Sequence, residues 1–308
     1  MQRMIVPGAN LWAMEPTRFR SMLTAMEAAC RAGMIIEVKA QESRVPRRNV
    51  SGVEIVEVRG VLDRNPSWLL EIMEGTSYAA IGAQVRAAVA DPEVGAILLI
   101  VDSPGGSVDG LADAADILLA ARAVKPVVAQ VQGMAASAAY YLSSQATKIN
   151  AGRMDWIGSI GTILPMYDWS EFYAKMGVKN ISFTSGAYKG SGMEGTPVTE
   201  EQKAYFQGIV DTASKDFYAA IRRGRSVEGL KDVADGRMFF APEAKAAGLI
   251  DSIKTLDETL AGLAKAKGTP RRARASLDIL VAEENEGTPS RADGDRSALH
   301  GNESGGSL

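Results

Sequence analysis

The sequence predicts a mixed α/β fold with a mostly parallel sheet, and two alternating patterns indicate it. Apolar runs typical of strands buried on both faces occur at residues 95–104 (GAILLIVDSP) and 125–133 (KPVVAQVQG). Segments with the composition and periodicity of helices lie around them, at residues 77–92, 105–124 and 137–146. Because alternating strands and helices imply parallel βαβ crossovers, we expect an α/β domain of this kind.

Helix and strand patterns also occur on both sides of these segments. Thr199 and Gln202 have the spacing of a capping box, which predicts the start of a long helix. The sequence also predicts strands at residues 53–58, 156–164, 178–185 and 248–253, and helices at residues 168–177 and from Pro242.

Changes in composition divide the chain into three parts. We expect residues 1–50 to form an N-terminal accessory arm with a helix near residues 16–32, and residues 51–264 to form the main domain. Residues 265–308 are polar and rich in glycine and serine, so we expect a disordered tail.

Composition also limits the possible functions. The net charge of −3 argues against nucleic acid as the main partner. Cys30 is the single cysteine, so no intrachain disulfide can form, and we interpret it as a buried structural thiol. No secretory signal and no apolar run near the roughly 20 residues of a membrane span occur. We therefore expect a soluble, cytoplasmic protein without a membrane anchor.

The chain contains one histidine, His300, in the polar tail. A core histidine base is therefore missing, which argues against a Ser-His-Asp triad, a Cys-His pair and a histidine-rich metal site. Any hydrolase on this sequence needs a different base.

Residues 102–108 (DSPGGSV), called here the glycine loop, follow a buried strand and precede a helix. Gly105 and Gly106 let backbone N–H groups approach a ligand closely, and the helix N-terminus adds positive potential. Such a loop can hold a phosphate or the oxyanion of acyl transfer, although the lysine pattern of a nucleotide-binding loop is absent. The alternative is an ordinary tight turn between a strand and a helix.

Residues 133–144 (GMAASAAYYLSS) place Ser137 among alanines at the expected start of a helix. The N–H of Ala138 has no partner within such a helix, so one turn can supply both a nucleophile and an oxyanion donor. The alternative is a serine that only caps the helix.

Residues 183–197 (FTSGAYKGSGMEGTP), called here the lysine segment, carry Lys189 between glycines. A lysine acts as a base only when it is neutral, so its reference pKa of roughly 10.4 must fall to about 7–8 through burial. Ser159, in GSIG at residues 158–161, has a hydroxyl that can orient such a lysine. The alternative for Lys189 is an ordinary solvated loop lysine.

In order and spacing, these motifs resemble the signal peptide peptidase A family, which are serine–lysine peptidases on the Clp protease/crotonase fold. The resemblance runs from about Val53 to Ile253, and Lys189 and Ser159 lie 52 and 22 residues after Ser137. It implies repeated ββα and βαβ units and no metal or other cofactor. By this resemblance Ser137 is the nucleophile and Lys189 the general base. The remaining implied roles are lysine orientation by Ser159, oxyanion binding by the N–H groups of Gly106 and Ala138, and shaping of the turn by Gly105.

Some features depart from many family members. Ala138-Ala139 stands where they have Gly-Gly, Lys189-Gly190 where they have Lys-Asp, and the N-terminal anchor of the membrane-bound members is missing. The chain is more similar to the phage branch, the capsid maturation proteases related to minor capsid protein C. The resemblance then implies scaffold and capsid proteins as substrates and a ring-like homo-oligomer. It also implies a location in the bacterial host cytoplasm or the prohead interior.

Three alternatives remain open from the sequence. A soluble bacterial member of the same family would degrade peptides. A crotonase-like acyl-CoA enzyme or binder would use the glycine loop but would need neither Ser137 nor Lys189. A non-catalytic capsid component would use neither of these residues chemically.

Overall fold

The computed structural model describes residues 11–31, 48–66, 70 and 74–265. All of them belong to one compact unit. The predictions for the Cys30 side chain, for His300 and for the tail beyond Lys265 lie outside the described residues.

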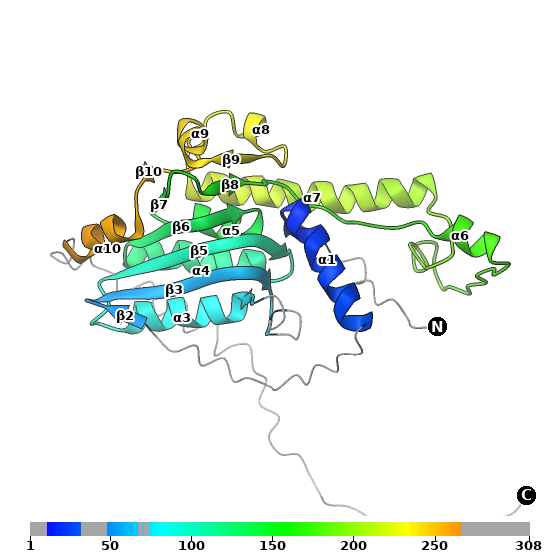
Figure 1. Ribbon diagram of the computed structural model, residues 1–308, viewed down its shortest axis with the longest axis horizontal. Helices are drawn as coiled ribbons and strands as arrows, with labels where there is room; N and C mark the ends of the chain where they lie inside the picture. Colours follow the sequence, from blue (N-terminus) through cyan, green and yellow to red (C-terminus); the bar gives the residue numbers. More distant parts are fainter. Residues whose placement is uncertain (1–10, 32–47, 67–69, 71–73, 266–308) are drawn as a thin grey trace, which may run out of the picture. The chain divides into compact units, whose positions relative to one another are not determined.

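The described part of the chain forms a sheet of ten strands (Figure 1). The main path runs in the order β10-β7-β6-β5-β3-β2, and all its pairs are parallel except β2 with β3. The predicted α/β class with a mostly parallel sheet is therefore confirmed. These strands are β2 (Arg48–Val50), β3 (Val53–Asp63), β5 (Ala96–Ser107), β6 (Val127–Ala136), β7 (Lys148–Ala151) and β10 (Ser252–Ile253).

Four short strands extend this sheet near the carboxyl ends of β3, β5 and β6. β1 pairs antiparallel with the end of β5, and β4 pairs parallel with the end of β3. β8 pairs parallel with the end of β6 and antiparallel with β9. These strands are β1 (Trp12–Met14), β4 (Thr76–Ser77), β8 (Trp156–Gly158) and β9 (Met238–Phe240).

Helices cover the sheet because alternate strand residues point to opposite faces. One face packs Val53, Leu98 and Val128 against Leu263 of α10 (Leu256–Lys265). Three helices lie side by side against the other face (Figure 1). They are α3 (Tyr78–Ala90), α4 (Leu111–Val124) and α5 (Ala138–Ser144). The Ser77 hydroxyl caps α3 by accepting a hydrogen bond from the Ala80 N–H.

α7 (Glu200–Gly224) begins with the predicted capping box, since Thr199 and Gln202 each bond the other's backbone. Only its C-terminal part is buried, at Phe217, Ala220 and Ile221, and its N-terminal part continues past the sheet (Figure 1). The other helices are α1 (Pro16–Arg31), α6 (Ser170–Lys175), α8 (Leu230–Val233) and α9 (Ala241–Ala246).

One strand prediction is wrong, and a second is wrong in part. Residues 178–185 form no strand, and side chains such as Phe183, 94% exposed, extend into solvent. A strand needs a neighbour to pair its backbone groups, and the described residues offer none there. The strand predicted at residues 156–164 ends as β8 at Gly158, because Ser159 and Gly161 adopt positive φ angles of 50° and 153°.

Candidate active site

Ser137 lies at the corner where β6 ends and α5 begins. Its φ of 51° and ψ of −117° are in a sparsely populated region for a residue with a side chain, which costs about 1–3 kcal/mol. The Ser137 N–H donates to the Gly158 carbonyl at 2.8 Å, and its own carbonyl accepts from the Tyr141 N–H at 2.9 Å. The surrounding structure thus holds the strained backbone in place, and strain of this kind is concentrated at functional sites.

The Ser137 side chain is buried and does not cap its helix. Its hydroxyl donates to the Gly161 carbonyl at 3.2 Å, and it makes no capping hydrogen bond to α5. The neighbouring alanines are fully buried, which lets the backbones of β5 and β6 approach this corner closely. Gly161 is a partner that the sequence did not reveal, because only folding brings it to Ser137.

The glycine loop lies directly against Ser137. Gly105 has a φ of +98°, and a Cβ there would lie 3.0 Å from both the Ser137 Cβ and the Ala138 nitrogen. A Cβ on Gly106 would lie 1.8 Å from the Leu62 carbonyl oxygen. Both positions therefore exclude any side chain, for reasons of space at Gly106 and of space and conformation at Gly105.

Gly105 takes part in a short chain of hydrogen bonds within the glycine loop. The Gly105 N–H donates to the Ser103 hydroxyl at 3.1 Å, and that hydroxyl donates to the Gly60 carbonyl at 2.6 Å. The N–H of Gly105 is therefore already bonded. The predicted turn at Gly105 and Gly106 is wrong, because β5 continues through both glycines to Ser107 and pairs there with β1 and β3. Ala138 is the first residue of α5, so its N–H has no acceptor within the helix. The structure brings Gly105, Ser137 and Ala138 together.

Ser159 is the neighbour of Ser137 across the sheet edge. Ala136 of β6 pairs with Gly158 of β8, and each serine follows directly after its strand. Ser159 has a φ of 50°, is buried, and donates its N–H to the Arg237 carbonyl at 2.8 Å. Ser137 and Ser159 thus follow directly after two adjacent parallel strands, and both have positive φ angles.

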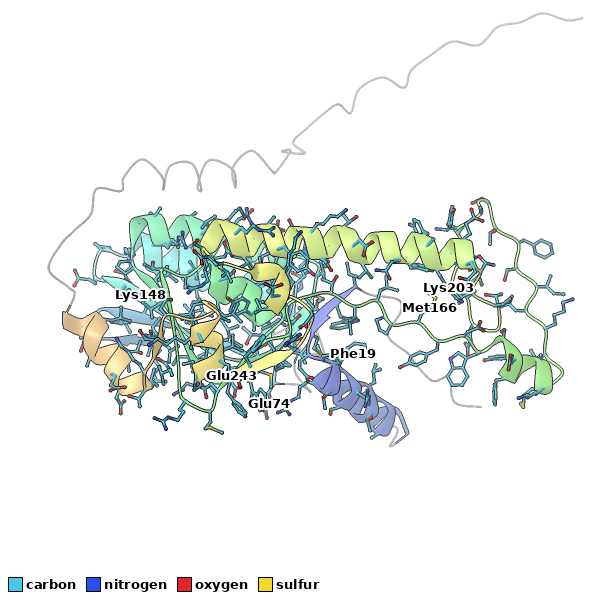
Figure 2. All side chains as sticks on the ribbon, turned by 90° about the horizontal axis from the view of Figure 1, so that it is seen from above. Phe19, Glu74, Lys148, Met166, Lys203 and Glu243 are labelled. Carbon is cyan, nitrogen blue, oxygen red and sulfur yellow. The ribbon has the colours of Figure 1, made fainter. Side chains whose placement is uncertain are left out.

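Lys189 is not part of this cluster. Its side chain is exposed, and among the described residues no hydrogen bond joins it to Ser137 or to Ser159. The burial that a neutral lysine requires is therefore not present around Lys189 in this arrangement. In Figure 2, Lys203 marks the N-terminal half of α7 and Met166 lies beside it, and both residues line one pocket.

The bonds around the lysine segment explain this separation. The Tyr188 hydroxyl donates to Glu201 in the first turn of α7 at 2.7 Å. α7 first contacts the surroundings of Ser137 nine residues later, where the Val210 carbonyl accepts a hydrogen bond of 3.1 Å from the Thr162 hydroxyl. At 1.5 Å per residue, about 14 Å of helix separates the two contacts. A single side chain cannot span that distance.

A largely apolar cavity of about 650 Å³ lies between α4, α7 and the residues that neighbour the Ser137 corner, although Ser137 itself does not line it. Tyr141, one helical turn after Ser137, forms part of its wall, and so does Thr162, which follows the Gly161 that accepts the Ser137 hydrogen bond. A cavity of this size and lining can hold an apolar side chain of a ligand. Other wall residues are Val108, Leu111, Ile209 and Phe217.

No group of three or more His, Cys, Asp or Glu side chains in the described residues is arranged to hold a metal ion. Within the same residues, no helix has the length and apolarity that crossing a lipid bilayer requires.

A strained, buried serine at a strand-to-helix corner, beside a glycine loop and a free helix N–H, is the geometry of a serine-type hydrolase on an α/β sheet. Comparison with known proteins gives the particular family. The model of peptidase family S49 matches residues 120–269. A Synechocystis protein named as a protease, slr0021, is 30% identical over 203 residues, 62% of this chain and 72% of its own length. The chain belongs to peptidase family S49, which confirms the resemblance seen in its motifs.

Other relatives and structures add detail. Capsid assembly protease C of Escherichia phage lambda is 28% identical over 233 residues, 75% of this chain and 53% of its own length. This chain spans between 47% and 66% of the length of the first four relatives. An enoyl-CoA hydratase/isomerase family protein from Silicibacter pomeroyi matches 78% of this chain and 88% of its own at 17% identity, with a TM-score of 0.44.

Proposed function

We propose that this chain is a serine endopeptidase that cleaves peptide bonds with a dyad of Ser137 and Lys189. The observation that carries the proposal is the convergence of the Ser137 corner, the Gly105 backbone of β5 and the Ala138 N–H. In this assignment the N–H groups of Gly106 and Ala138 bind the oxyanion, and Ser159 orients the lysine. Family membership supports the reaction class.

The reaction has two halves. Neutral Lys189 takes the Ser137 hydroxyl proton as the oxygen attacks the peptide carbonyl, and the oxyanion accepts bonds from Gly106 and Ala138. The protonated lysine then gives its proton to the leaving amine, which leaves an acyl-enzyme. Lys189 next takes a proton from water, and the resulting attack releases the acid and restores Ser137.

The exposed position of Lys189 sets a condition on this mechanism. Either the lysine segment moves onto Ser137 of its own chain, or a second copy of the chain supplies it. The surface around the segment favours a partner, because large exposed apolar patches on soluble proteins mark interaction sites. The exposed side chains near it are Tyr167, Phe172, Met176, Val178, Ile181 and Phe183. We propose a homo-oligomer that buries this surface.

We further propose that the substrates are scaffold and capsid proteins of a phage or prophage head. Likeness to the capsid assembly protease C of phage lambda and to the head-tail preconnector protein GP5 of phage P21 supports this. The enzyme would then act in the prohead or in the host cytoplasm before assembly.

The test is cleavage of a scaffold protein or casein by the purified chain, followed by intact mass. We expect cleavage by the wild type and none by Ser137→Ala or Lys189→Ala. Lys179→Ala, which removes another exposed lysine of the same region, is the matched control and should remain active. Equal cleavage by wild type and Ser137→Ala would refute the proposal, and tight acyl-CoA binding without cleavage would favour the crotonase-like alternative.

Mixing the two inactive variants shows where the lysine comes from. If a second copy supplies Lys189, a mixture of Ser137→Ala and Lys189→Ala chains contains some complete sites and recovers part of the activity. If the lysine segment acts within its own chain, the mixture stays inactive. Either result is compatible with the dyad and decides its assembly.

A further inference from the structure

Residues 11–15 lie as an extended strand along the glycine loop. In β1, Ala13 is opposite Gly106 and Met14 is opposite Gly105, antiparallel to β5. Beyond the strand, the Val108 N–H donates to the Leu11 carbonyl at 3.1 Å, and the Glu15 N–H donates to the Pro104 carbonyl at 2.7 Å. The segment therefore pairs with the whole loop.

The other edge of the segment pairs with the opposite wall of the site. The Trp12 N–H donates to the Ile163 carbonyl at 2.9 Å, and the Ile163 N–H donates back to the Trp12 carbonyl at 2.8 Å. Ile163 follows two residues after Gly161, which accepts the Ser137 hydrogen bond. A segment of the chain thus fills the space between the two walls that flank Ser137. Peptides bind by adding such a strand to exposed backbone edges.

The backbone of the segment reaches the reactive centre itself. A Cβ built on Gly105 would lie 2.1 Å from the Ala13 carbonyl oxygen and 3.0 Å from both the Ala138 nitrogen and the Ser137 Cβ. The Ala13 carbonyl oxygen, the Ser137 Cβ and the Ala138 nitrogen therefore all lie close to Gly105. This is the region that the carbonyl of a substrate must enter.

The side chains of the segment explain how it is held. Trp12, Ala13 and Met14 are all buried, and Leu11 lines the 650 Å³ cavity. The rings of Trp12 and Phe19 of α1 lie 5.5 Å apart. Trp12, Met14 and Phe19 also form a cluster with Met22, Val61 and Leu70. A small residue thus faces the glycine loop, and bulky apolar residues on either side provide the anchors.

We propose that residues 11–15 occupy the peptide-binding cleft of Ser137 as a built-in substrate mimic. This inference rests on the proposed peptidase function. Its structural evidence is the strand pairing of residues 11–15. A substrate then runs antiparallel to the end of β5, with a small residue opposite Gly106 and large apolar residues beside it. While the segment is bound, added peptides are excluded, so the chain inhibits itself until the segment leaves.

The test uses the full chain and a fluorescein-labelled peptide with the sequence of residues 11–19 (LWAMEPTRF). Fluorescence anisotropy measures its binding to the wild type and to the double variant Trp12→Ala/Phe19→Ala, which loses the aromatic anchors. We expect the variant to bind the peptide at least tenfold more tightly than the wild type. Adding Gly105→Ala should abolish that gain, because its Cβ would collide with the bound strand.

Ala13→Asp is a second way to release the segment, because it places a charge at a fully buried position. It guards against a double variant that does not fold. Equal peptide binding by the wild type and by folded released variants would overturn the inference.

Cleavage of casein by the same proteins separates the two proposals. A released variant that binds the peptide and cleaves casein at least tenfold faster than the wild type supports both. A variant that binds the peptide but cleaves nothing leaves the substrate mimic standing and counts against the peptidase.

Discussion

The main-chain N–H of Ser137 donates a hydrogen bond of 2.8 Å to the carbonyl oxygen of Gly158. This bond joins the corner after β6 to the last residue of β8. Gly158 has a φ of 133°, and a Cβ there would lie 2.5 Å from the Arg237 carbonyl oxygen. The position of the candidate nucleophile therefore depends on a glycine that sits 21 residues further along the chain.

Gly158→Ala should lower both stability and activity. The strained φ costs about 1–3 kcal/mol, and the collision with the Arg237 backbone adds to it. Gly248→Ala is the matched control, because Gly248 also has a positive φ, 74°, but open space around its Cβ position. Urea unfolding and casein cleavage measure the two effects. Equal losses of stability in the two variants would contradict the role given to the collision.

Gly106→Ala should reduce the rate of cleavage by about 100–1000-fold, the usual effect of losing one oxyanion donor. The added Cβ would meet the Leu62 carbonyl oxygen at 1.8 Å and push the loop from its place. Gly75→Ala produces a similar collision, 2.2 Å from the Val61 carbonyl oxygen, away from Ser137. If both variants lose activity only in proportion to their lost stability, Gly106 is not an oxyanion residue.

Ser159→Ala should slow cleavage and move the acidic limb of the pH–rate profile to higher pH. The reason is that a hydroxyl which donates a hydrogen bond to the lysine amine stabilises the neutral, basic form, so without it the base becomes active only at higher pH. Rates measured between pH 6 and 10 show the profile, and Ser182→Ala, at an exposed serine in the same part of the chain as Lys189, is the control. A slower variant with an unchanged profile would indicate a purely structural serine.

Because Tyr140 is buried, the free energy of unfolding should fall at alkaline pH. Burial raises the pKa of Tyr140 well above its usual value, and the charge of Arg225 opposes that rise. An unfolded tyrosine ionises near pH 10, so the native chain keeps a proton that the unfolded chain loses. The stability is fully present below about pH 10 and falls above it by up to about 1.4 kcal/mol per pH unit.

Tyr140→Phe tests this expectation by urea unfolding from pH 8 to 11. At neutral pH the variant should lose about 1 kcal/mol, because the bond of 3.0 Å from the Tyr140 hydroxyl to the Leu249 carbonyl is gone. Above pH 10 its free energy of unfolding should fall less steeply than that of the wild type. Tyr167→Phe, at an exposed ring, is the control. Parallel curves for wild type and Tyr140→Phe would contradict the prediction.

Local features of this protein could be read from short stretches of sequence. The strands at β5 and β6, the capping box at Thr199 and the helix start after Ser137 all follow from patterns within about 20 residues. The two adjacent glycines indicated a point of close backbone approach, which the structure places within β5 and not in a turn after it. By contrast, residues 178–185 have a strand-like composition but form no strand, since pairing depends on a partner elsewhere.

The sequence by itself determined the residue types at the corner: a serine among alanines, two adjacent glycines, and no histidine between residues 1 and 299 to act as base. Backbone preference and burial are encoded locally, so these features needed no tertiary information. Only the tertiary structure decided that Gly161 accepts the Ser137 hydroxyl, that Ala13 reaches the glycine loop, and that Lys189 lies along α7 away from them. Such contacts join segments far apart in the chain, and they arise from the packing of the whole fold.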